Sequence, residues 1–191
     1  ANELSVNEWA DMVRDLPKFK DYHRALFEEL RRRNLDVKLL ATDASPIDSW
    51  PTIEWAAEHM DDITGVYGGH HYINDFHPND ESFYPWFLAK AEWGVGVARR
   101  RQKDFIVGEF GAKQDMRVIN GVMQDRCVYW DTPEEPLVSI QLAEAALASI
   151  NAGVHAIGYW TFMDLPDERD STRLNQWGLF RRSGADYSPR A

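Results

Sequence analysis

The sequence is poor in cysteine and in positive charge, and it has no long apolar run. Its one cysteine, Cys127, cannot form an internal disulfide, and no histidine-partnered motif surrounds it, so we interpret it as a buried or incidental thiol. With 21 basic against 31 acidic residues, the net charge is -10. This charge argues against a nucleic-acid or anionic-membrane partner, because binding phosphates needs a basic face. No stretch of 18 apolar residues is present, so we expect no membrane-spanning helix.

Patterns that bind metal ions are also missing. His70 and His71 are adjacent on an expected strand, so their side chains point to opposite faces and cannot share one metal. The stretch 74–80, "NDFHPND", lacks the glycine and the distal glutamate of the known calcium loop. We therefore predict no metal and no cofactor.

What the sequence does contain is enough apolar material for one domain over residues 1–191, with 44% hydrophobic and 13% aromatic residues. Helical periodicity alternates with short apolar runs that are typical of strands. The expected helices are 18–34, 51–60, 83–102 and 137–153, and the expected strands are 37–45, 63–72, 105–111 and 154–162. We interpret 113–136 as a loop. Alternating strands and helices, with strands apolar on both faces, predict an α/β fold with a parallel sheet covered by helices.

Polar residues gather where these strands end. Because the carboxyl ends of parallel strands meet at one edge of a sheet, function is expected there. The residues are Asp43 and Ser45, then His70, His71 and Tyr72, then Glu109, and finally Trp160 and Asp164.

The stretch "FIVGEFG" (105–111) carries Glu109 to the end of a buried strand, and a partner carboxylate is available near the start of the chain. There "ANELSVNEW" contains asparagine followed by glutamate twice, as Asn2-Glu3 and Asn7-Glu8. Two carboxylates facing one cleft are what cleavage of a glycosidic bond requires, one to protonate the leaving oxygen and one to attack the anomeric carbon.

With these motifs the chain resembles the C-terminal half of a retaining glycoside hydrolase of the large (β/α)8-barrel clan that includes the cellulases and mannanases of family five. In that clan an asparagine and the acid/base glutamate end strand four, which matches Asn2-Glu3. The nucleophile glutamate ends strand seven, which matches Glu109. A His-x-Tyr on strand six matches His70 and Tyr72, and a tryptophan on strand eight matches Trp160 in "GYWTF".

The resemblance implies a role for each matching residue. Glu109 would be the nucleophile and Glu3, which matches better than Glu8, the acid and then the base. Asn2 would bind the 2-hydroxyl of the sugar, and Tyr72 would donate a hydrogen bond to Glu109.

Two further positions have implied binding roles. Trp160 would form the apolar floor under the sugar ring. His70 would be a supporting hydrogen-bond partner, although a histidine on a buried strand is also often a satisfied core residue.

The resemblance also implies a fold and partners. The fold would be a (β/α)8 TIM barrel of which the chain holds the end of strand four and strands five to eight. The substrate would be a carbohydrate, and the protein would be secreted or periplasmic. The sheet would be completed by an N-terminal half-barrel or by a second copy.

Two other functions remain open. One is a carbohydrate-binding half-barrel without turnover. The other is a different barrel enzyme, which would need a phosphate-binding glycine-rich loop that "YWTFMDLPDERD" does not offer.

Overall fold

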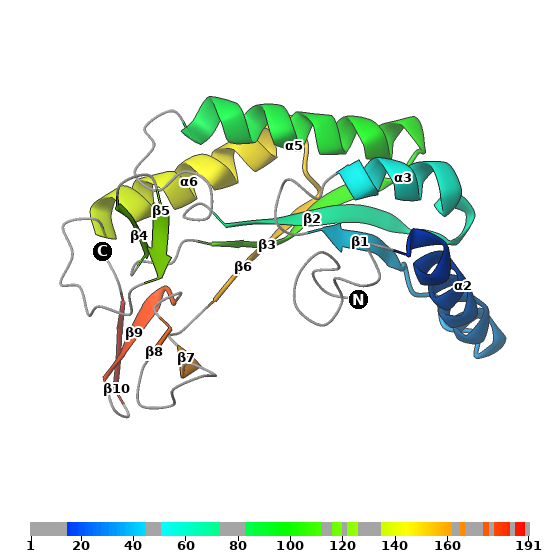
Figure 1. The fold of residues 1–191 in the computed structure, drawn as a ribbon, viewed down its shortest axis with the longest axis horizontal. Coiled ribbons are helices and arrows are strands. Elements are labelled where there is room, and N and C mark those ends of the chain that lie inside the picture. Colours follow the sequence, from blue (N-terminus) through cyan, green and yellow to red (C-terminus); the bar gives the residue numbers. More distant parts are fainter. Residues whose placement is uncertain are drawn as a thin grey trace.

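Four parallel strands form a sheet in the order β1-β2-β3-β6 (Figure 1). A computed structural model describes residues 15–44, 51–72, 83–111, 116–119, 122–125, 135–161, 165–166, 174–175, 178–183 and 186–189. Strands alternate with helices along the chain. The elements are α2 (Leu16–Arg32), β1 (Leu40–Ala44), α3 (Pro51–His59), β2 (Val66–Tyr72), α5 (Phe83–Arg100), β3 (Asp104–Gly111), α6 (Glu135–Ala152) and β6 (Ala156–Tyr159). The predicted α/β fold with a parallel sheet is confirmed.

The prediction of 113–136 as a loop was wrong in part. A hairpin lies inside it, with β4 (Met116–Ile119) antiparallel to β5 (Val122–Asp125). Two shorter strands, β7 (Leu165–Pro166) and β8 (Leu174–Asn175), also pair, as do β9 (Phe180–Ser183) and β10 (Asp186–Pro189). All three pairs lie toward the end of the sheet where β2 and β3 finish, on the left in Figure 1. They therefore surround the end where function was expected.

The helices α3, α5 and α6 lie on one face of the sheet, and α2 lies at its β1 side (Figure 1). The core fills the space between this helical layer and the sheet, with Phe105, Tyr67 and Phe87 at most 2% exposed. No described helix covers the opposite face. None of the described helices is both long and apolar enough to span a bilayer.

Contact between α5 and β3 depends on a small residue. A Cβ atom placed on Gly94 would lie 2.5 Å from Cζ of Phe105, whose ring is buried. Glycine at this position therefore lets the helix backbone rest directly on the aromatic ring.

The end of α6 has a specific stop signal. Gly153 has a φ of +81°, and the amide of Val154 donates to the carbonyl of Ser149 at 2.9 Å. This is the hydrogen-bond pattern of a helix closed by a glycine in the left-handed conformation. It turns the chain directly into β6, as the sequence predicted.

The amino-terminal end of the sheet is held by a polar network. The Tyr67 hydroxyl donates to Oδ1 of Asp61 at 2.7 Å, and the Lys103 ammonium donates to the same oxygen at 2.6 Å. Burial alone would raise the pKa of Asp61, but the hydrogen bonds from Lys103 and Tyr67 outweigh burial and hold it below its ordinary value. Burial and the bond to Asp61 raise the pKa of Tyr67. The network joins the segments that precede β2 and β3.

His23 is the buried histidine of α2. It is 4% exposed, lies against Phe19 with ring centroids 5.6 Å apart, and its Nε2 has no hydrogen-bond partner among the described residues. Burial lowers the pKa of His23 from 6.5 to about 4. The folded protein therefore holds this ring neutral at pH 5, where the unfolded chain protonates it.

We predict that alanine substitution has opposite effects on stability at two glycines of α5, Gly94 and Gly96. Gly94→Ala should lower the free energy of unfolding by roughly 1–3 kcal/mol, because the added methyl collides with Phe105. Gly96→Ala is the matched control. Its Cβ would meet nothing closer than Arg100 at 3.8 Å, so it should raise stability by up to about 1 kcal/mol. Urea unfolding measures both, and equal effects would contradict this packing.

We also predict that acid destabilises the fold through His23. Since its folded pKa lies below the unfolded value, stability falls as the pH drops from 6.5 toward 4, by at most about 2 kcal/mol between pH 7 and 5. Urea unfolding at pH 7 and pH 5 measures the loss. His23→Gln should remove this part of the pH dependence; a variant with the wild-type slope would show that other groups cause it.

Candidate functional site

Glu109, His70 and Trp160 lie at the carboxyl ends of three neighbouring strands. Glu109 is near the end of β3, His70 is near the end of β2, and Trp160 directly follows β6. Because β3 lies between β2 and β6, the structure brings these three predicted residues to the same end of the sheet.

A β-bulge in β3 decides which face Glu109 occupies. The register pairs Gly69 with Val107 but His70 with Glu109, so β3 has one extra residue, Gly108, between the two pairs. Up to Val107 the strand alternates regularly, and both Phe105 and Val107 are buried. Without the bulge, Glu109 would follow them onto the helix-covered face.

The extra residue reverses the alternation at that point. Glu109 therefore shares a face with His70, on the side of the sheet opposite to Phe105 and the helices. The pairing with β6 has the same irregularity, since Val107 pairs with Ile157 and Phe110 with Tyr159. A bulge of this kind is a common way to aim a side chain at an active site.

The bulge requires a glycine on the neighbouring strand. A Cβ atom on Gly158 would lie 2.4 Å from the carbonyl oxygen of Gly108. No other residue lets β6 approach the bulge so closely. Gly158 therefore sets the distance between Glu109 on β3 and Trp160, the residue that follows β6.

The side chains of His70 and Glu109 are in contact. His70 Nδ1 lies 3.5 Å from Oε2 of Glu109, with His70 fully buried and the Glu109 side chain 19% exposed. The imidazole therefore packs against the carboxylate from the buried side and restricts its orientation. A carboxylate that is held on one side and partly open on the other is suited to act on a molecule arriving from solvent.

The backbone of Trp160 is hydrogen-bonded to β3, and the residue is 40% exposed. Its amide donates to the carbonyl of Phe110 at 2.8 Å, and the Phe110 ring meets Tyr159 edge-on with centroids 5.4 Å apart. The peptide bond between Trp160 and Thr161 is cis. The backbone that carries Trp160 is thus bonded to the residue that directly follows Glu109.

Other predicted site residues lie wholly or partly outside the described part of the structure. Asn2, Glu3 and Glu8 fall in residues 1–14, and Cys127 also lies outside it. Tyr72 ends β2 in register with Gly111, but its side chain is not described. The pairing of Glu3 with Glu109, and the hydrogen bond from Tyr72, remain predictions.

The structure shows a second β-bulge, in β1, that the sequence did not indicate. Between Ala41 and Ala44 the pairing of β1 with β2 shifts by one residue, and Thr42 has a φ of +43°. Such a backbone is strained for a β-branched residue and typically costs about 1–3 kcal/mol. No sequence signal marks this bulge, because threonine is an ordinary strand residue.

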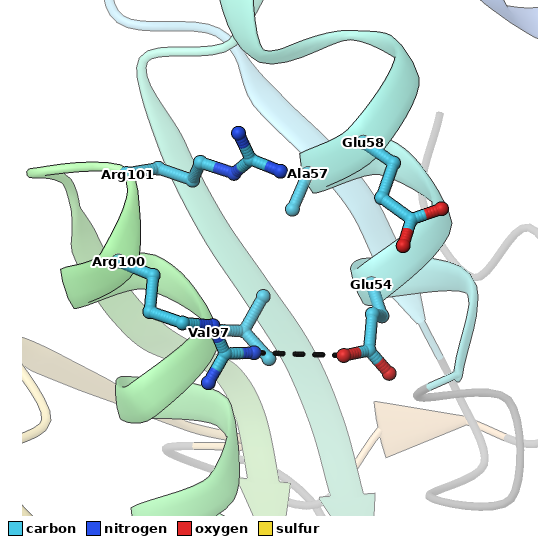
Figure 2. A pocket seen from close by; sticks show the side chains of 6 residues that line it. All are labelled: Glu54, Ala57, Glu58, Val97, Arg100 and Arg101. Atoms are coloured by element: carbon cyan, nitrogen blue, oxygen red, sulfur yellow. Dashed lines mark hydrogen bonds and ion pairs between the residues drawn. The ribbon is translucent and has the colours of Figure 1, made fainter.

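A recess of about 90 Å³ lies away from this site, between α3 and α5 (Figure 2). Arg100 Nη2 and Glu54 Oε1 approach to 3.5 Å at its edge, and both side chains are at least half exposed. Its lining is completed by Ala57, Glu58, Val97 and Arg101. An exposed ion pair on the outer helices is a surface feature.

The described residues contain no cluster of three metal-ligating side chains.

Comparison with known proteins identifies the fold. No protein-family model matches the chain, and no curated protein sequence matches it. Among solved structures, the Bifidobacterium dentium beta-glucuronidase complexed with coumarin-3-O-glucuronide matches with a TM-score of 0.57 at 16% identity, over 91% of this chain and 25% of that one. At this identity the likeness shows the fold alone.

Weaker matches belong to similar enzymes. Faecalibacterium prausnitzii beta-glucuronidase has a TM-score of 0.46 at 15% identity, over 90% of this chain and 33% of that one. The endo-1,4-beta-D-mannanase of Thermotoga petrophila RKU-1 has a TM-score of 0.43 at 12% identity, over 73% and 35%. The chain spans only about a quarter to a third of the length of these three structures. It has a fold like that of part of a glycoside hydrolase.

We predict that Gly158→Ala disturbs the site as well as the fold. The methyl group would collide with the Gly108 carbonyl, so β6 must move away from β3 or the bulge must rearrange. A loss of roughly 2–4 kcal/mol in unfolding free energy is expected. Urea unfolding measures it, with Gly96→Ala as control. Wild-type stability would contradict the close approach of the two strands.

Proposed function

We propose that the chain is the C-terminal half of a (β/α)8 retaining β-glycosidase, with Glu109 as its nucleophile. The observation that carries the proposal is the bulge at Gly108, which places Glu109 beside His70 on the face that no described helix covers. In a (β/α)8 barrel that face is the interior, and the carboxyl ends of its strands hold the active site. The glycosidase-like fold supports the same reading.

The reaction takes two steps. First, a Glu109 oxygen attacks the anomeric carbon and forms a glycosyl ester, while Glu3 gives its proton to the departing glycosidic oxygen. Then Glu3 takes a proton from water, the water oxygen attacks the same carbon, and the bond to Glu109 breaks. Two inversions leave the product with its original β configuration.

The neighbouring residues support these steps. Buried His70 keeps the Glu109 carboxylate from turning, so that an oxygen faces the sugar. The exposed part of the Trp160 ring offers an apolar surface for the C–H groups of a pyranose. Tyr72 donates a hydrogen bond to Glu109, and Asn2 binds the 2-hydroxyl, where contacts strengthen in the transition state.

The proposed substrate is a β-linked polysaccharide or oligosaccharide. The enzyme with the matching fold is named as a beta-glucuronidase complexed with coumarin-3-O-glucuronide, and this name specifies a β-linked sugar. The clan is therefore proposed in preference to the narrower assignment to family five. Within it, residues 1–191 form one domain that supplies four of the eight strands.

Trapping of the covalent intermediate tests this proposal. Aryl 2-deoxy-2-fluoro-β-glycosides form the glycosyl ester but hydrolyse it slowly. We expect one equivalent of label on the peptide that contains Glu109, found by mass spectrometry, and turnover of ordinary aryl β-glycosides that falls at least about a thousandfold in Glu109→Gln.

The matched control is Glu54→Gln, which removes an equal charge from the outer helices and should leave labelling and turnover unchanged. Label on another carboxylate would assign the nucleophile elsewhere. Sugar binding without label or turnover, in both the wild type and Glu109→Gln, would favour a carbohydrate-binding half-barrel.

A further inference from the structure

The bulge in β1 acts on Asp43 as the bulge in β3 acts on the proposed nucleophile. Ala41 pairs with Tyr67, and both residues are fully buried under the helices. Regular alternation would bring Asp43, two residues further on, to the same covered face. The shifted register pairs Ala44 with Gly69 instead, so a small apolar residue takes that place.

Asp43 therefore lies on the opposite face of β1. Among the residues of this strand only Thr42 has a positive φ, so Asp43 and Ala44 keep the alternation of a strand. Ala44 is on the covered face, and Asp43 is on the other one, which no described helix covers. His70 and Glu109 share that face. The side chain of Asp43 is not described, so this placement comes from the register.

The bulge in β1 is costly for the fold. Thr42 is a β-branched residue in the left-handed conformation, it is 1% exposed, and its hydroxyl has no hydrogen-bond partner among the described residues. Strain and an unsatisfied buried hydroxyl both lower stability. Strained backbone is concentrated at functional sites. The consequence of this bulge is the changed face of Asp43, which indicates a functional role for that residue.

Asp43 and Glu109 lie on either side of His70. The strand that carries His70, β2, runs between β1 and β3. His70 pairs with Glu109, whereas Asp43 lies two residues before that level, counted from the pair of Ala44 with Gly69. By strand geometry the backbones of the two acidic residues are roughly 10 Å apart across the sheet and roughly 7 Å apart along the strands. A sugar ring that lies over β2 can therefore reach both carboxylates.

The sheet supplies negative but no positive charge at this end. Its strands β1, β2, β3 and β6 contain neither lysine nor arginine, and their acidic residues are Asp43, Glu109 and Asp104. Asp104 begins β3, at the other end of the sheet, where the Lys38 ammonium donates to it at 3.2 Å. The carboxylates of Asp43 and Glu109 would repel an anionic sugar, but they accept hydrogen bonds from the hydroxyls of a neutral one.

We propose that Asp43 is a substrate-binding residue of the Glu109 site, which accepts a hydrogen bond from a sugar hydroxyl and selects neutral β-glycosides over β-uronides. A uronide has a carboxylate in place of the neutral hydroxymethyl group at C6, so it would meet two like charges. The inference rests on the proposed glycosidase function and adds a substrate class to it.

Kinetics of Asp43→Asn test the proposal, because this change keeps the shape of the side chain and removes its charge. The substrates are an aryl β-glycoside and the aryl β-uronide with the same ring configuration, and the wild type should prefer the neutral one. In the variant, kcat/KM for the neutral substrate should fall about 5- to 10-fold, since a hydrogen bond to a neutral amide is weaker than one to a carboxylate. The value for the uronide should not fall.

The matched control is Asp104→Asn, which makes the same change on a strand of the same sheet but at the amino end. It should leave both kcat/KM values and their ratio unchanged.

Thiol labelling tests the placement of Asp43 without any substrate. In a Cys127→Ser background, Asp43→Cys should react with a water-soluble maleimide while circular dichroism shows a folded protein. Ala41→Cys is the control and should stay unreactive, because position 41 is fully buried under the helices.

Three results would overturn the proposal. One is an unreactive thiol at position 43 in the folded protein. Another is an unchanged substrate preference in Asp43→Asn, in a protein whose turnover is still lost in Glu109→Gln; the glycosidase function would then stand without this role for Asp43. Absence of turnover in the wild type would overturn the glycosidase function and this inference with it.

Discussion

The single extra residue in β3 is the constraint on which the candidate site depends. A parallel strand buried under helices directs alternate side chains into the core, and the residue at position 109 would follow Phe105 and Val107 there. An isolated carboxylate in that apolar layer would cost several kcal/mol. The bulge at Gly108 turns Glu109 to the other face, where His70 packs against it. The same sheet can therefore have an apolar layer under the helices and a partly exposed carboxylate on its other face.

The two ends of the sheet have different physical roles. At the amino-terminal end, Asp61, Lys103 and Tyr67 form a compact network whose hydrogen bonds join β2 and the segment before it to the residue that precedes β3. At the carboxyl end, two strands contain bulges, and Thr42 has a strained backbone. A hydrogen-bonded polar network at one end and irregular backbone at the other are the arrangement expected when one end stabilises the fold and the other carries function.

The periodic elements could be predicted from the sequence, because burial of α5 or β3 leaves an apolar pattern within a single segment. The hairpin of β4 and β5 was missed, although Asn120-Gly121 between apolar residues is a known turn signal. The bulge could not be predicted, because it depends on the register between strands far apart in the sequence. The sequence feature related to the bulge is a pair of glycines, Gly108 and Gly158, whose contact is seen only in the structure.

The measurement that tests the account most directly is the separation of the Glu3 and Glu109 carboxyl groups in a crystal structure of the assembled barrel. Nucleophilic attack by Glu109 requires the two groups to lie about 5 Å apart across the cleft. A separation near 9 Å would leave room for a water molecule and indicate inversion instead. A Glu109 side chain directed into the helical layer would contradict the role of the bulge itself.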